Sequence, residues 1–104
     1  MPVILVVEDD ISFSMMLKTY LTRKHFEVTT VQTVAKAKAA LRDKQFDLIL
    51  SDMRLPDGEG TELLAWIHSE NKTTPFICCS CGCFSCYSKI IALYEQCTMI
   101  MSQG

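Results

Sequence analysis

An apolar run that ends in acid lies at the start of the chain: Val3-Ile4-Leu5-Val6-Val7-Glu8-Asp9-Asp10. A second run of the same kind lies near the middle: Leu48-Ile49-Leu50-Ser51-Asp52. Continuous apolar runs of this length indicate strands that are buried on both faces, as in a parallel sheet. The edge at which such strands end is where open α/β folds bind ligands. Carboxylates gathered there would repel one another, so the pattern predicts a site for a hard divalent cation.

Length and composition place the chain in an ordinary class of globular protein. Its 104 residues suffice for one domain with one core and are too few for two. The net charge of -2 gives no electrostatic reason to expect nucleic-acid binding. The first apolar run is too short for a membrane span and lacks the features of a signal peptide, so we expect no membrane association and a cytoplasmic location.

Strand-like and helix-like segments alternate along the chain. Strands are expected at residues 26–31 and 46–50 and from Pro75 onward. Helices are expected after Asp10 with Ser12 as a candidate N-cap, over residues 34–41 after Thr33, and from Gly60 onward; Pro56-Asp57-Gly58 forms a turn. We expect the apolar residues of the first helix to face the sheet: Phe13, Met16, Leu17, Tyr20 and Leu21. This order predicts an α/β fold with a doubly wound, right-handed parallel sheet.

At these residues the chain resembles the receiver domain of two-component response regulators, which has a flavodoxin-like (CheY-like) fold. Residues 4–10 look like the family's first strand with its acidic pair. Residues 47–58 look like the phosphoacceptor strand and the loop that follows it, Asp47-Leu48-Ile49-Leu50-Ser51-Asp52-Met53-Arg54-Leu55-Pro56-Asp57-Gly58. The second run is most like receivers of AAA+ transcriptional activators. The resemblance therefore implies a partner sensor histidine kinase and output domains that are absent from this chain.

The resemblance also implies a role for each acid. Asp52 is the nucleophile that takes a phosphoryl group from a kinase phosphohistidine, in phosphorelay signal transduction. Asp9 binds Mg²⁺ directly, Glu8 binds it through water, and the backbone carbonyl of Arg54 supplies another oxygen. Asp52 itself also belongs to the metal-binding group. Glu8 departs mildly from the more common Asp of the family. On this reading the chain is a phosphoprotein of a signalling pathway and not an enzyme.

Ser80 is the candidate for one further phosphoryl contact. The family has a Thr or Ser at the end of its fourth strand, five residues after a Pro like Pro75, and Ser80 stands at that position. Its hydroxyl would donate to a phosphoryl oxygen. The other interpretation is a Ser within an irregular Cys-rich loop.

The resemblance fails after about residue 80. The family's fifth strand ends in a Lys that contacts the phosphoryl group, yet Lys89 follows Ser80 too closely to fill that place and no Lys comes after it. We therefore expect a receiver core over residues 1–80, without a recognisable fifth βα unit, and an atypical tail over residues 81–104. A frameshifted or truncated gene end would explain the abrupt change in composition.

Two other functions remain open from the sequence. All six cysteines lie at or after Cys78. Five of them could form a metal or redox module, although their spacing lacks the paired pattern of zinc sites: Cys78, Cys79, Cys81, Cys83 and Cys86. A Mg²⁺-dependent phosphohydrolase of the haloacid-dehalogenase type also uses an Asp after an apolar strand. That family has a second Asp two residues further on, where this chain has Arg54.

Overall fold

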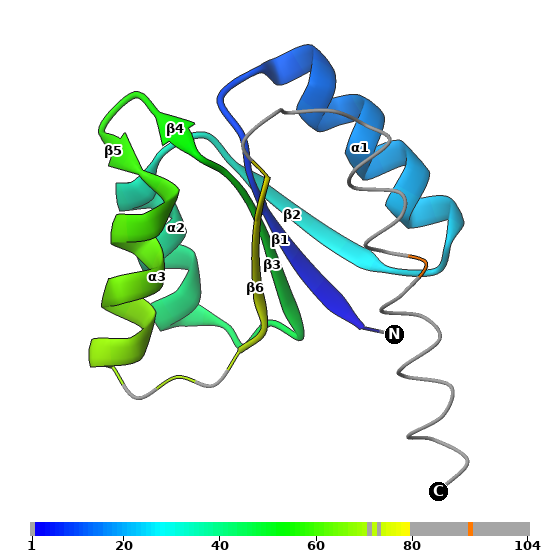
Figure 1. Ribbon diagram of the computed structural model, residues 1–104. Helices are drawn as coiled ribbons and strands as arrows, with labels where there is room; N and C mark the ends of the chain where they lie inside the picture. Colours follow the sequence, from blue (N-terminus) through cyan, green and yellow to red (C-terminus); the bar gives the residue numbers. More distant parts are fainter. Residues whose placement is uncertain (1, 71, 73, 80–91, 93–104) are drawn as a thin grey trace, which may run out of the picture.

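The computed structural model describes residues 2–70, 72, 74–79 and 92, and its strands and helices alternate as expected (Figure 1). The main strands are β1 (Val3–Val7), β2 (Glu27–Val31), β3 (Leu48–Asp52) and β6 (Phe76–Cys79). The helices are α1 (Ile11–Arg23), α2 (Val34–Asp43) and α3 (Gly60–Ser69). Two short strands, β4 (Arg54–Leu55) and β5 (Gly58–Glu59), form a hairpin between β3 and α3.

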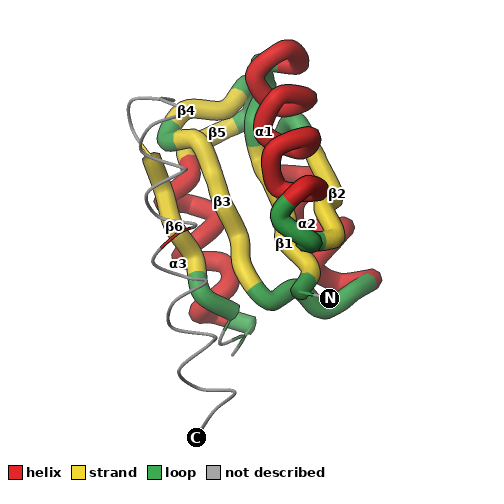
Figure 2. Tube along the Cα trace, turned by 90° about the vertical axis from the view of Figure 1, so that its right-hand side faces the viewer, coloured by secondary structure: helices red, strands yellow, loops and turns green. Residues whose placement is uncertain are grey.

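The main strands form one parallel sheet in the order β2-β1-β3-β6. Helix α1 covers one face, while α2 and α3 cover the other (Figures 1 and 2). The prediction of a doubly wound parallel sheet is confirmed. Strands β1 and β3 are neighbours, so the acids that follow or end them lie at the same edge of the sheet.

The two faces of the sheet explain why the first apolar run contains no polar residue. Leu5 and Val7 pack in a cluster with residues of α2 and α3, whereas Ile4 and Val6 pack in a second cluster with residues of α1. Successive side chains of a strand point to opposite faces, and here both faces are covered by helices. Burial of each such side chain contributes roughly 1.5–3 kcal/mol, which favours an apolar residue at every position.

Helix α1 differs from the sequence-based expectation at two positions. Its N-cap is Asp10 and not Ser12, because the Asp10 carboxylate accepts a hydrogen bond from the Phe13 backbone N–H at 3.0 Å. Met16 is 48% exposed, although we expected it to face the sheet. The buried line of the helix runs through Ser14, Leu17 and Leu21, which places Met16 to one side of it.

Most of the tail lies outside the described residues. The expected lack of a recognisable fifth βα unit therefore concerns residues that the structure does not describe. Within the described residues β6 has β3 on one side and no strand on the other. Among the residues that the structure describes, no helix is long and apolar enough to cross a membrane.

Candidate functional site

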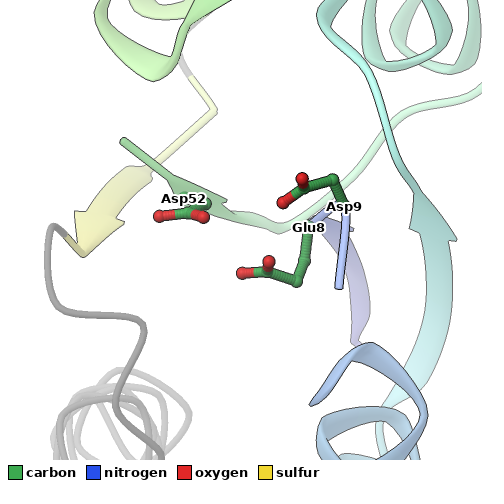
Figure 3. Close-up of side chains that lie close together, drawn as sticks. All are labelled: Glu8, Asp9 and Asp52. Atoms are coloured by element: carbon green, nitrogen blue, oxygen red, sulfur yellow. The ribbon is translucent and has the colours of Figure 1, made fainter. Parts of the chain in front are cut away.

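Three carboxylates meet at the edge of the sheet where β1 and β3 end. Glu8 and Asp9 directly follow β1, and Asp52 is the last residue of β3. One carboxylate oxygen from each residue lies within 4.8 Å of the others. Figure 3 shows the three side chains pointing into the same space from these two strands. Because Val7 pairs with Ser51, the parallel register itself brings Glu8 opposite Asp52.

Glu8 is a buried acid that the backbone holds in place. Its side chain is only 4% exposed, its backbone N–H donates to the Val31 carbonyl at 2.9 Å, and its carboxylate accepts from the Asp10 N–H at 3.1 Å. Burial raises the pKa of Glu8 from 4.5 to about 7; the bond from Asp10 opposes this rise, and the neighbouring carboxylates of Asp52 and Asp9 add to it. A bound cation would therefore relieve an unfavourable charge here.

Asp52 is accessible to a reagent while its backbone is fixed. Its side chain is partly exposed, and its Oδ1 atom accepts a hydrogen bond from the Met53 N–H at 2.8 Å. The neighbouring Ser51 is fully buried, and its hydroxyl donates to the Asp52 carbonyl at 2.9 Å. The carboxylate thus stands at the boundary between the core and the solvent, where it can react.

The donor set fits a small divalent cation. Carboxylate and carbonyl oxygens are the ligands that Mg²⁺ prefers, and two or three of them leave room for water and phosphate. The structure brings together Glu8, Asp9 and Asp52, as the sequence predicts. Arg54 begins β4 two residues after Asp52, with its side chain exposed. Ser80 lies outside the described residues; β6 ends at Cys79, which pairs with Asp52.

Two further acids make hydrogen bonds that the sequence-based predictions did not include. Asp10 caps α1 and donates its N–H to Glu8, so it connects the acidic group to the helix. Asp57, which we expected only in a turn, accepts hydrogen bonds from the backbone N–H groups of Val34 and Ala35 at the start of α2. The position of Asp10 just before a helical pattern is a local signal for its capping role. The contact of Asp57 with Val34 joins residues 23 positions apart in the sequence, so no local signal indicates it.

Comparison with known proteins gives one consistent answer. The sequence profile of the response regulator receiver domain matches residues 4–91. The chain is 35% identical over 71 residues to response regulator protein PilR of Pseudomonas aeruginosa, an alignment that covers 68% of this chain. It covers 16% of PilR, so the chain spans about a sixth of the length of this relative.

Solved structures agree with the sequence comparison. The non-phosphorylated receiver domain of HemR from Leptospira biflexa has a TM-score of 0.70 and 37% identity, covering 75% of this chain and 63% of that chain. The MaeR response regulator bound to beryllium trifluoride has a TM-score of 0.72 and 31% identity, covering 78% of this chain and 68% of that chain. Both are similar to this chain in sequence as well as in fold.

Proposed function

The chain belongs to the response regulator receiver family, and from this premise we propose that Asp52 accepts a phosphoryl group from the phosphohistidine of a sensor histidine kinase. Receiver domains are signalling domains rather than catalysts. The observation that carries the proposal is the meeting of Asp52 with Glu8 and Asp9 within 4.8 Å. Together the three acids can hold a cation, which would offset the negative charge of an incoming phosphoryl group, whereas an isolated strand-end Asp could not.

The proposed step is a direct phosphoryl transfer. An oxygen of the Asp52 carboxylate attacks phosphorus, the P–N bond to the kinase histidine breaks, and its electron pair stays on the imidazole. The product is an acyl phosphate on Asp52. The partial exposure of this side chain gives the donor a path to the nucleophile.

Mg²⁺ is the proposed cofactor, and when bound it neutralises charge on the transferring phosphoryl group. Asp9, which is exposed, ligates it directly, and the buried Glu8 holds it through water. The backbone carbonyl of Arg54 supplies a further oxygen. Ser80 donates its hydroxyl to a phosphoryl oxygen; its place directly after Cys79, the residue paired with Asp52, supports this role.

The wider setting of the chain is part of the same proposal. A histidine kinase is the partner, the location is cytoplasmic, and any output domain belongs to a longer protein of the kind to which the chain is similar. The receiver core over residues 1–80 carries the site. The family profile extends to residue 91, which includes the first part of the Cys-rich tail.

Acetyl phosphate tests the proposal without knowledge of the kinase. With Mg²⁺ present, intact-mass measurement is expected to show the addition of one phosphoryl group, which hydroxylamine removes because the linkage is an acyl phosphate. Asp52→Asn should abolish the addition. The control is Asp43→Asn, which changes an exposed acid at the end of α2 and should leave the addition unchanged.

The same samples distinguish the alternatives. Steady release of phosphate from a phosphate ester would favour a phosphohydrolase and contradict the proposal, as would phosphorylation of the Asp52→Asn variant at an equal rate. The comparisons support neither the phosphohydrolase nor the cysteine module. The cysteine side chains lie outside the described residues.

A further inference from the structure

The segment between Asp52 and α3 forms a closed unit. Strands β4 and β5 pair antiparallel, with Arg54 opposite Glu59 and Leu55 opposite Gly58. The base of the hairpin is closed by a hydrogen bond from the Gly60 N–H to the Met53 carbonyl at 2.8 Å. Because Met53 directly follows Asp52, the direction in which this unit leaves β3 sets where the Arg54 backbone lies.

The tip of this hairpin is bound to a different helix. Asp57 Oδ1 accepts from the Val34 N–H at 2.8 Å, and Oδ2 accepts from the Ala35 N–H at 2.9 Å. These N–H groups belong to the first two residues of α2 and have no partner within the helix. The two bonds lower the pKa of the Asp57 carboxyl, so it is ionised at neutral pH and bonds as a charged acceptor.

Two further contacts hold the hairpin against the helical layer. Leu55 is 9% exposed and belongs to the core cluster that includes Val34. Gly58 lies so close to α3 that an added Cβ would stand 2.5 Å from Glu62 Oε2, and it would also lie 3.6 Å from Val34 Cγ2. The hairpin is thus attached at its base by a backbone hydrogen bond, at Leu55 by apolar packing and at Asp57 by side-chain hydrogen bonds to α2.

We propose that Asp57 is a positioning residue for the metal and phosphoryl site: by binding the tip of the β4–β5 hairpin to α2, it fixes the Arg54 backbone oxygen relative to Asp52. Asp57 itself touches neither metal nor phosphoryl group. The inference rests on the proposed function, in which the Arg54 carbonyl is a metal ligand. It explains why an exposed loop acid makes two hydrogen bonds to a helix that begins 23 residues earlier.

If Asp57 acted only as a cap of α2, its loss should affect metal binding no more than the loss of another cap of the same helix. A second cap of α2 therefore provides the matched control. Thr33 caps the same helix end through a hydrogen bond from the Lys36 N–H to its hydroxyl at 3.1 Å. Thr33→Ala therefore removes an α2 cap without touching the hairpin. Asp57→Ala removes caps and releases the hairpin tip as well.

The test is the binding of Mn²⁺, used as a probe for Mg²⁺, to the whole chain, measured by the electron paramagnetic resonance signal of the free ion. Asp57→Ala is expected to weaken Mn²⁺ binding about tenfold, the size of effect that supporting residues have at metal sites. Thr33→Ala should change it by less than about twofold. Asp57→Asn, which keeps one acceptor oxygen and provides a folded variant if the Ala variant unfolds, should fall between the two.

Each outcome decides between the claims. Equal Mn²⁺ affinity in the Asp57 variants and the wild type overturns the positioning role alone. Equal losses in Asp57→Ala and Thr33→Ala would show that helix stability, and not the hairpin, controls the site. If the wild-type chain binds no Mn²⁺, the proposed function itself fails and this inference fails with it.

Discussion

The protonation state of the buried acid Glu8 links the carboxylate site to the free energy of unfolding of the protein. Its side chain is 4% exposed, and burial raises its pKa to about 7, with the charges of Asp52 and Asp9 adding to the effect. In the metal-free protein Glu8 therefore keeps its proton over part of the range in which other carboxyl groups are ionised. A cation in the site would favour the ionised form.

This shift predicts the pH dependence of the metal-free protein. Between about pH 4.5 and about pH 7 the folded state binds more protons at Glu8 than the unfolded state does. The free energy of unfolding should therefore fall as the pH rises through that range. Glu8 should contribute about 1–2 kcal/mol to this fall, less than the full shift implies because the site is open to solvent on one side.

Urea unfolding with a chelator present measures the effect. Glu8→Gln should remove this part of the pH dependence and be more stable than the wild type above about pH 7. Glu70→Gln, at an exposed position after α3, should retain it. The same pH slope in Glu8→Gln and the wild type would contradict the prediction.

At the scale of the elements, the three helices that the structure describes do not all begin in the same way. Asp10 caps α1 and Thr33 caps α2, each with a side-chain acceptor for a free backbone N–H. Glu59, at the N-cap of α3, makes no such side-chain cap bond; within the described residues its carboxylate accepts a hydrogen bond from the Thr61 hydroxyl at 3.4 Å. The additional methylene of Glu compared with Asp makes it a poor cap, so α3 begins without this contribution.

Glu59→Asp is therefore expected to stabilise the protein. The shorter carboxylate can accept from the free N–H groups of the first turn of α3, and the free energy of unfolding should rise by about 1 kcal/mol in urea. Glu59→Ala serves as the control. It should cost less than about 0.5 kcal/mol, because the native side chain makes no cap bond. A Glu59→Asp variant no more stable than the wild type would contradict this account.

The elements also show what the sequence can and cannot predict. Both apolar runs were correctly predicted as strands of a parallel sheet. The structure makes these strands neighbours, and the acids at their ends meet because parallel strands end at a common edge. The β4–β5 hairpin was predicted only as a turn, since strands of two residues carry no periodic pattern. The contact between Asp57 and α2 arises from tertiary packing alone, so no local pattern reveals it.

At the scale of the whole molecule, the apolar core on both faces of the sheet holds mutually repelling carboxylates together at one edge. Strands β1 and β3 are buried on both faces, so their ends cannot move apart without exposing core residues. The carboxylates at those ends are therefore held within 4.8 Å of one another despite their repulsion. A cation that relieves this repulsion should stabilise the entire fold and not only the site.

This coupling predicts that Mg²⁺ stabilises the folded chain by mass action. At a free concentration ten times its dissociation constant, Mg²⁺ bound only to the folded state raises the free energy of unfolding by about 1.4 kcal/mol. Urea unfolding with Mg²⁺, compared with NaCl at matched ionic strength, measures this increase. Asp9→Asn should lose most of it, because Asp9 is the exposed acid of the group and the proposed direct ligand.

Asp52→Asn provides the second half of this test. Removing one charge from the group should make the metal-free protein more stable than the wild type, since less repulsion remains between the strand ends. The same variant should gain less from Mg²⁺, because the ion has one carboxylate fewer to bind. Equal stabilisation of Asp52→Asn and the wild type by Mg²⁺ would mean that the ion acts elsewhere on the surface, and the acids at the ends of β1 and β3 would not form a metal site.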